Sequence, residues 1–188
     1  MKSVLISIQP KWCELIASGK KTVEVRKTRP KIDVPFKCYI YETRGKSDRP
    51  ILLDFGVLDF HGRGQVIGEF MCYAIETVSW ISNPQKSNWR EHYNEETCLT
   101  NTETYEYTKG NIFYEWHISD LVIYDEPKEL SEFRKECKLD CDMRFLNEPP
   151  CEKCEHLVAS FGCGRTIIRP PQSWCYVERK EYKESERL

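Results

Sequence analysis

Short runs of β-branched residues, with a single helix signal between the first two, constrain the fold of this chain most. Residues 3–9 read SVLISIQ, and residues 22–27 read TVEVRK. Between these runs, Pro10 suits the first turn of a helix and Gly19 suits its end. Further strand signals lie at 36–41, 66–75, 112–124 and 174–178. This pattern predicts an α+β fold, a small mixed β-barrel with flanking helices.

Length and composition favour one soluble globular domain. The chain has 188 residues, of which 40% are hydrophobic and 31% charged, and a chain of this size forms one core. We therefore expect a single domain over 1–188, with a cysteine-rich insert at 137–169 and a charged tail at 179–188. The polar stretch 83–110 predicts helices near 86–94 and 103–109. No apolar run is long enough for a membrane span or a secretory signal, which predicts a cytoplasmic protein.

Positive charge is concentrated near the N-terminus. Residues 1–31 contain eight lysines or arginines and two glutamates, although the formal net charge of the chain is -2. A basic patch favours an anionic partner, because contacts with phosphates release bound counterions. The alternative is a basic surface that is merely solvated.

The strand signal at 22–27 places Thr22, Glu24 and Arg26 on one face. A glutamate paired with a lysine or an arginine stays ionised and accepts hydrogen bonds from the amino group of a base. Neighbouring cations are suited to holding a phosphate. The alternative interpretation is an ion pair at the mouth of a barrel.

These residues resemble the ASCH domain family, which is related to the PUA and EVE/YTH-like barrels. Gly19, Lys21, Glu24 and Arg26 fit the family signature G-x-K-x-x-E-x-R. The flanking segments ISIQPKWCELIASGKKTVEVRKTRP, VIGEF, YEWHISDLVIYDEPKEL and RPPQSWCYVE are similar to pieces of bacterial and phage-borne members. The resemblance leaves out chiefly residues 83–102 and the cysteine-rich insert.

The resemblance implies a cleft between strand and helix that binds RNA or a nucleotide-like ligand. Some similar small members are amidohydrolases of N4-acylated cytidine that use a lysine, a threonine and a glutamate. The lysine corresponds to Lys21 and the glutamate to Glu69, but the threonine position is Glu24 here, so that mechanism does not transfer. Thr22 is the nearest hydroxyl that could replace it. Other relatives are ribonucleases, for which Lys21, Glu24 and Glu69 would supply acid, base and charge stabilisation.

Aromatic and polar side chains next to the matched motifs are candidates for ligand contact. Among Trp12, Trp116 and Trp174 we expect one to stack on a base, with Trp174 or Trp12 favoured, and the others to belong to the core. Gln172 and Ser173 follow two prolines in a turn that the resemblance places near the cleft. Their alternative role is to form the turn itself.

Five cysteines lie close together in the insert: Cys137, Cys141, Cys151, Cys154 and Cys163. Four thiolates in a tetrahedron bind zinc, and C-x2-C is the usual half of such a site. The spacing predicts a structural Zn²⁺ held by four of the five, with free thiols or a redox-active pair as alternatives. We expect Cys13, Cys38, Cys72 and Cys175 to lie in the core.

Three functions are compatible with these features. The first is binding of RNA or a modified nucleoside in a basic cleft that contains Lys21, Thr22, Glu24 and Arg26. The second is hydrolysis, either of N4-acylated cytidine or of RNA, by Lys21, Glu24 and Glu69. The third is a zinc-stabilised module that binds another protein through the insert.

Overall fold

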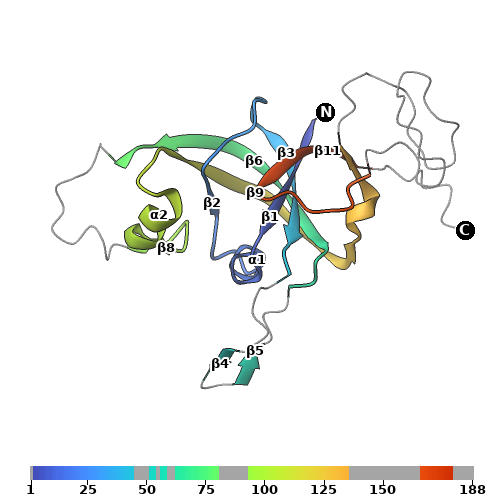
Figure 1. Ribbon diagram of the computed structural model, residues 1–188, viewed down its shortest axis with the longest axis horizontal. Helices are drawn as coiled ribbons and strands as arrows, with labels where there is room; N and C mark the ends of the chain where they lie inside the picture. Colours follow the sequence, from blue (N-terminus) through green and yellow to red (C-terminus); the bar gives the residue numbers. More distant parts are fainter. Residues whose placement is uncertain are drawn as a thin grey trace, which may run out of the picture.

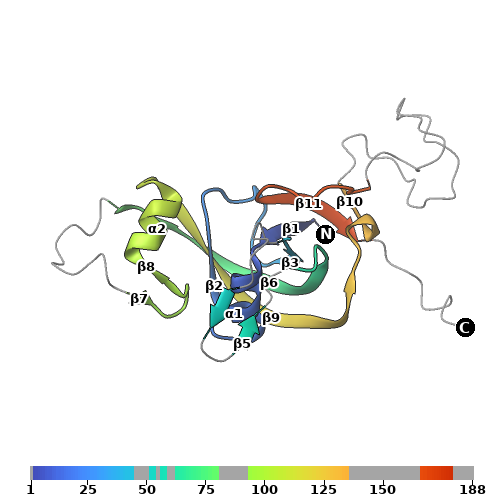
Figure 2. The ribbon, with the colours of Figure 1, turned by 60° about the horizontal axis from the view of Figure 1, so that its bottom comes forward.

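The computed structural model describes residues 2–44, 51–53, 56–58, 62–80, 93–135 and 166–179. Its centre is a curved seven-stranded sheet, with one helix beside its first strand and a second helix further out (Figures 1 and 2). In their order across the sheet, the strands are β10 (Phe133–Lys135), β11 (Trp174–Arg179), β1 (Ser3–Ile8), β3 (Phe36–Glu42), β6 (Val66–Val78), β9 (Phe113–Lys128) and β2 (Val23–Arg26).

Short elements complete the described fold. The helices are α1 (Pro10–Ala17), α2 (Asn101–Thr108) and the 3-10 turn η3 (Leu130–Glu132). Two small sheets are separate from the main one. In the first, β4 (Ile51–Leu53) pairs with β5 (Gly56–Leu58), and in the second, β7 (Tyr93–Asn94) pairs with β8 (Leu99–Thr100). No helix among the described residues is both long enough and apolar enough to cross a membrane.

Local sequence explains where the two helices begin and end. Pro10 opens α1, and Gly19, with φ +73°, follows it in the left-handed conformation that favours glycine. In α2 the side chain of Thr100 accepts a hydrogen bond from the Glu103 N–H, and the Glu103 carboxylate accepts one from the Thr100 N–H. This reciprocal capping stabilises a helix that has few apolar residues of its own.

The sheet is mixed but not closed. β1 runs parallel to β3, whereas the other neighbouring strands are antiparallel. β10 and β2 are the two edges of this sheet. The α+β, sheet-dominated fold is therefore confirmed, but the predicted barrel is not. Instead of pairing with a further strand, β2 reaches the end of β1 through the side chain of Arg26, whose Nη2 donates to the Ser7 carbonyl at 2.7 Å.

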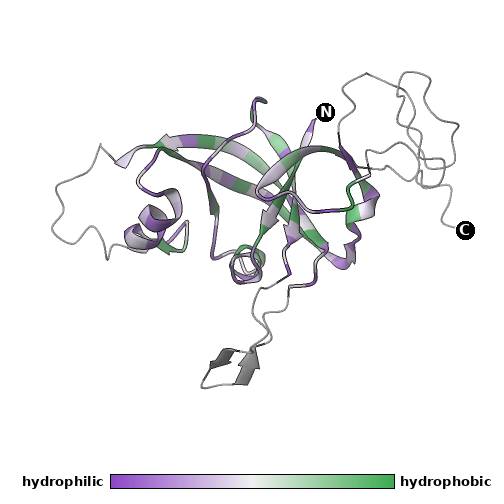
Figure 3. Ribbon diagram, viewed as in Figure 1, coloured by the Kyte–Doolittle hydropathy of each residue, from purple (hydrophilic) through white to green (hydrophobic). Residues whose placement is uncertain are grey.

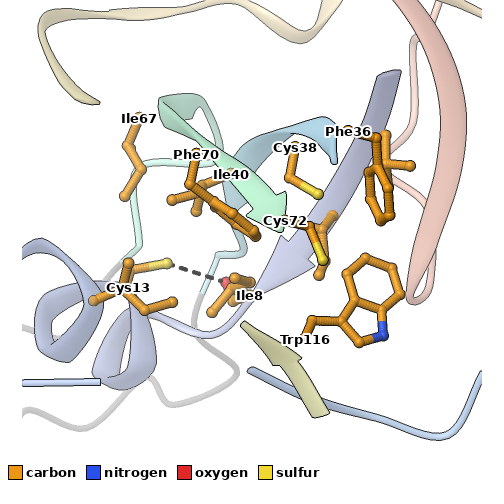
Figure 4. Close-up of a cluster of buried hydrophobic side chains, with 12 residues drawn as sticks. Ile8, Cys13, Phe36, Cys38, Ile40, Ile67, Phe70, Cys72 and Trp116 are labelled. Carbon is orange, nitrogen blue, oxygen red and sulfur yellow. Dashed lines mark hydrogen bonds between the residues drawn. The ribbon is translucent and has the colours of Figure 1, made fainter. Parts of the chain in front are cut away.

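Apolar residues form a separate cluster on each face of the sheet. Both apolar and polar residues occur along the strands (Figure 3), and consecutive side chains of a strand point to opposite faces, so Val4 belongs to one cluster and Leu5 to the other. The first cluster packs under α1 and includes Cys13, Phe36, Phe70 and Trp116 (Figure 4). The second includes Tyr39, Leu130, Phe133, Ile167 and Val177. On β6, consecutive residues 69 and 70 therefore face different clusters.

The main predicted elements are confirmed, and the small ones were missed. The six strand signals correspond to β1, β2, β3, β6, β9 and β11, and the signal at 103–109 corresponds to α2. The predicted helix over 86–94 lies outside the described residues except for its last two positions, which form β7. Most of the insert at 137–169, and the tail beyond residue 179, also lie outside the described residues.

Candidate nucleic-acid interface

Three charged side chains, Lys21, Glu24 and Arg26, lie together under the surface at β2. They are 2%, 6% and 6% exposed, respectively. The Glu24 carboxylate lies 3.4 Å from Nζ of Lys21 and 3.0 Å from Nη2 of Arg26. Ion pairs this well shielded from water interact strongly, because the local dielectric constant is low. We call these three residues the β2 charge cluster.

The turn between β7 and β8 fixes one end of the β2 charge cluster. Nζ of Lys21 donates to the carbonyl of Thr97 at 2.6 Å. The adjacent carbonyl of Glu96 accepts hydrogen bonds from the backbone N–H groups of Thr22 and Val23 at 2.9 and 3.0 Å. Lys21 thus joins β2 to the segment that carries α2, as well as pairing with Glu24.

Arg26 fixes the other end of the cluster, where the sheet is open. Besides Ser7, its guanidinium contacts the Ser173 hydroxyl at 3.5 Å, which is a long hydrogen bond. Burial raises the pKa of Tyr107 on α2, and the positive charge of Arg26 opposes that shift. The gap between β2 and β1 is therefore spanned by the side chain of Arg26, which contacts Ser7 and Ser173.

Two half-buried tryptophans lie near β2, Trp12 against Lys21 and Trp174 against Trp116, the residue that pairs with Glu24 in the sheet. Nζ of Lys21 is 5.3 Å from the ring centroid of Trp12, a residue of α1 that is half-buried. Trp174 is also half-buried, packs against Trp116 at 6.1 Å and donates from Nε1 to the Thr28 hydroxyl at 3.0 Å. Trp116 is fully buried and belongs to the core, so Trp12 and Trp174 are the predicted tryptophans that remain partly accessible.

The electrostatics of the cluster favour an additional hydrogen-bond acceptor. Two cations share one carboxylate, which leaves one unbalanced positive charge among the three residues. Two buried N–H donors, Nε of Arg26 and Nε1 of Trp116, have no hydrogen-bond partner among the described residues. In Figure 4 the Trp116 nitrogen is turned away from the other side chains of the core. Unpaired buried donors are costly, so an oxygen of water or of a ligand would stabilise this region.

The predicted residue Glu69 lies elsewhere. Its carboxylate pairs with Nζ of Lys37 and accepts a hydrogen bond from the Tyr124 hydroxyl, both at 2.5 Å. Because its neighbour Phe70 points into the core under α1, Glu69 points to the opposite face of β6. The structure therefore does not bring Glu69 together with Lys21 and Glu24, as the hydrolytic mechanisms would require.

The other predicted ligand contacts differ in their placement. Thr22 is exposed, because it precedes β2 and its side chain is not part of the buried face. Gln172 is exposed as well, and it makes no hydrogen bond or ion pair with the β2 charge cluster among the described residues. Ser173, by contrast, reaches Arg26, and its carbonyl accepts a hydrogen bond from the Ser7 N–H at 2.9 Å.

The five predicted zinc ligands Cys137, Cys141, Cys151, Cys154 and Cys163 lie outside the described residues. Within the described ranges, no group of histidine, cysteine or acidic residues could hold a metal ion. Cys13, Cys38 and Cys72 are buried as expected, and Cys175 is half-buried. Burial raises the pKa of each of these four thiols, that of Cys72 to about 12, so they are unreactive core residues.

Two contributors were missed by sequence reasoning. Thr97 acts through its backbone carbonyl, for which no side-chain signal exists. Tyr107 lies in the polar stretch, where the helix was predicted but its orientation toward β2 was not. No sequence signal would have revealed this orientation, because α2 has no apolar face.

Comparison with known proteins gives a family and a fold. A sequence model of the ASCH domain matches residues 6–133. No curated protein matches the sequence significantly. The crystal structure of ASCH from Zymomonas mobilis is similar, with a TM-score of 0.53 and 21% identity over 94% of this chain and 87% of that chain.

Crystal structures of two mutants of that Zymomonas mobilis protein give the same result. A tyrosine-to-phenylalanine mutant has a TM-score of 0.54, covering 96% of this chain and 93% of that one, and a serine-to-alanine mutant has 0.53, covering 95% and 89%. Both are 20% identical in sequence to this chain. At such identities the likeness concerns the fold.

Proposed function

Because this chain belongs to the ASCH domain family, whose members are generally RNA-binding domains of PUA-like fold, we propose that it binds RNA, or a modified nucleoside, at β2. The single observation that carries the proposal is the β2 charge cluster, which is buried, has one excess positive charge and contacts the half-buried ring of Trp12 through Lys21. Phosphates and base oxygens are acceptors that suit such a site.

The contacts of the cluster suggest how a ligand would enter. At 3.5 Å, the bond from Arg26 to Ser173 is longer than the 2.7 Å bond from Arg26 to the Ser7 carbonyl. A ligand oxygen could replace the Ser173 hydroxyl at little cost and also accept from the unpaired donors nearby. Glu24 would then accept from an amino group of the base, while the rings on either side stack on its faces.

A screen of short RNAs and modified nucleosides tests the proposal. Binding is measured with wild type and with Lys21→Met, which removes one charge of the cluster but keeps the aliphatic chain. We expect saturable binding by wild type that weakens as salt rises, and weaker binding by the variant. Lys37→Met is the matched control, because Lys37 forms its ion pair with Glu69 on the opposite face.

Loss of folding is separated from loss of binding by a melting curve of each variant, because Lys21 also holds the turn at Thr97. The proposal is abandoned if a folded wild-type protein binds none of the RNAs and nucleosides at low salt. The same samples are assayed for release of acetate from N4-acetylcytidine and for RNA cleavage. Turnover that Lys21→Met abolishes would establish a hydrolase instead.

We also propose that four of the cysteines Cys137, Cys141, Cys151, Cys154 and Cys163 hold one structural zinc ion. Support comes from their spacing, in particular the pair Cys151 and Cys154 in a C-x2-C motif. Native mass spectrometry with and without a chelator measures this. One zinc per chain, lost on chelation, is the expected result, and a metal-free mass in both samples would refute it.

A further inference from the structure

We propose that the bound RNA is single-stranded and lies along three aromatic residues, Trp12, Tyr107 and Tyr114, each of which is paired with a cation. We call these residues and their cations the aromatic strip. This inference rests on the proposed function, since it names the form of RNA and adds contacts outside the β2 charge cluster.

Each ring of the aromatic strip has a positively charged group over its face. Nζ of Lys11 is 4.4 Å from the ring centroid of Trp12, and Nζ of Lys27 is 4.7 Å from that of Tyr107. The guanidinium carbon of Arg29 is 6.0 Å from the centroid of Tyr114. These side chains come from α1, from the residues directly after β2, from α2 and from β9.

The cations of the strip are available to phosphates. Lys11, Lys27 and Arg29 are exposed, and none of them forms an ion pair with another residue that the structure describes. A weak cation–π contact is readily exchanged for a phosphate contact, because the latter also releases counterions. When the cation moves to a phosphate, it uncovers the ring face on which a base can stack.

The aromatic strip is continuous with the β2 charge cluster. Trp12 contacts Lys21 at one end of the cluster, and Arg26, at the other end, is close enough for its positive charge to act on the hydroxyl of Tyr107. Figures 1 and 2 both place β2 between α1 and α2. A chain of nucleotides that passes over β2 would therefore meet first one ring and then the other, with positive charge at both.

Accessible rings favour a single strand over a duplex. Tyr107 is 40% exposed, which leaves a substantial part of its surface free. An aromatic side chain stacks on a base only if that base is unstacked from its neighbours, and bases in a double helix are not. The alternation of ring and cation is the arrangement that binds single strands with little sequence preference.

Tyr107 gives the sharpest test. Fluorescence anisotropy measures the affinity of a labelled short single-stranded RNA for wild type, Tyr107→Ala and Tyr107→Phe. We expect Tyr107→Ala to weaken binding about 5-fold to 150-fold, the range that loss of one stacked base at about 1–3 kcal/mol corresponds to. Tyr107→Phe should keep most of the affinity, because it keeps the ring and loses only the hydroxyl.

Lys27→Gln tests the cation of the same pair. A plot of the logarithm of the binding constant against the logarithm of the salt concentration has a negative slope. Lys27→Gln should make this slope less steep by about 0.7, the value for one phosphate contact in a single strand. Tyr73→Ala is the matched control, because Tyr73 is 52% exposed and packs against His117, with no cation over its ring among the described residues. This control should bind RNA as wild type does.

The competing outcomes are distinguishable. If wild type binds the RNA but Tyr107→Ala binds equally well, the aromatic strip is wrong while the proposed function stands. Tighter binding of duplex RNA, or equal binding of a free nucleoside, also overturns the strip. Tighter binding of single-stranded DNA than RNA keeps the strip but overturns RNA as its ligand. If nothing binds, both proposals fail together.

Discussion

At the scale of single residues, Glu24 has the largest expected effect on stability. Its carboxylate pairs with both Lys21 and Arg26, and all three side chains are almost fully buried. Glu24→Gln would leave two buried cations without a counter-charge. We expect it to lower the free energy of unfolding by about 3–5 kcal/mol, measured by urea denaturation. The exposed Glu95 provides the control Glu95→Gln, and an equal effect of both substitutions would contradict this interpretation of the cluster.

Glu115 gives a prediction about pH. Burial, followed by the nearby charge of Glu76, raises the pKa of Glu115 above its usual 4.5. The folded protein therefore holds this proton at pH values where the unfolded chain has lost it, so stability falls as pH rises from about 4. Glu115→Gln, which cannot ionise, should melt at a higher temperature than wild type at neutral pH.

The difference between Glu115→Gln and wild type should disappear at and below about pH 4, where the carboxyl is protonated in both folded and unfolded states. Thermal melts across this range measure it. The exposed Glu126, in the form Glu126→Gln, serves as control. A gap between the melting temperatures that is constant with pH would show that packing, rather than ionisation, causes it.

Single residues of the site were only partly predictable from sequence. The period of two in β2 correctly placed Glu24 and Arg26 on one face. Glu69 was grouped with them from the family resemblance, and sequence alone does not reveal which face of a curved sheet a charged residue occupies. The roles of the Thr97 carbonyl and of the unpaired Trp116 nitrogen depend on tertiary packing, which no local pattern encodes.

At the scale of elements, the pairing of β6 with β9 depends on Gly68. A Cβ at this position would lie 2.4 Å from the backbone oxygen of Val122, too close for β9 to keep its place. We expect Gly68→Ala to lower the free energy of unfolding by about 1–3 kcal/mol, the usual cost of overpacking. Urea denaturation beside Thr77→Ala, an exposed position on the same strand, measures this. If Gly68→Ala and Thr77→Ala had equal free energies of unfolding, β9 would be able to move away from the added methyl group without cost.

Element prediction succeeded where the sequence pattern was long. β-branched residues identified β1 and β2, aromatic residues identified β3, and Pro10 with Gly19 identified the limits of α1. The pairs β4–β5 and β7–β8 were missed because strands of two or three residues are too short to show alternation. How α2 sits beside β2 was not predictable either, because the helix has no apolar face that would indicate its partner.

At the scale of the whole molecule, the sheet is open beside the β2 charge cluster. β2 is an edge strand, and side chains rather than a neighbouring strand connect it with β1 and the residues before β11. A closed barrel, as the sequence pattern suggested, would have filled this gap with backbone hydrogen bonds. Sequence could not distinguish the two, since closure depends on the accumulated curvature of all seven strands.

Mapping photo-crosslinks between the full chain and a short single-stranded RNA that contains 4-thiouridine tests the central claim most directly. The account predicts that the crosslinked peptides, identified by mass spectrometry, contain Trp12, Tyr107 or Trp174. These residues lie next to the β2 charge cluster or the core tryptophan Trp116 that borders it. Crosslinks confined to other parts of the chain, such as the face of Glu69 and Tyr124, would contradict the account, and so would the absence of any crosslink.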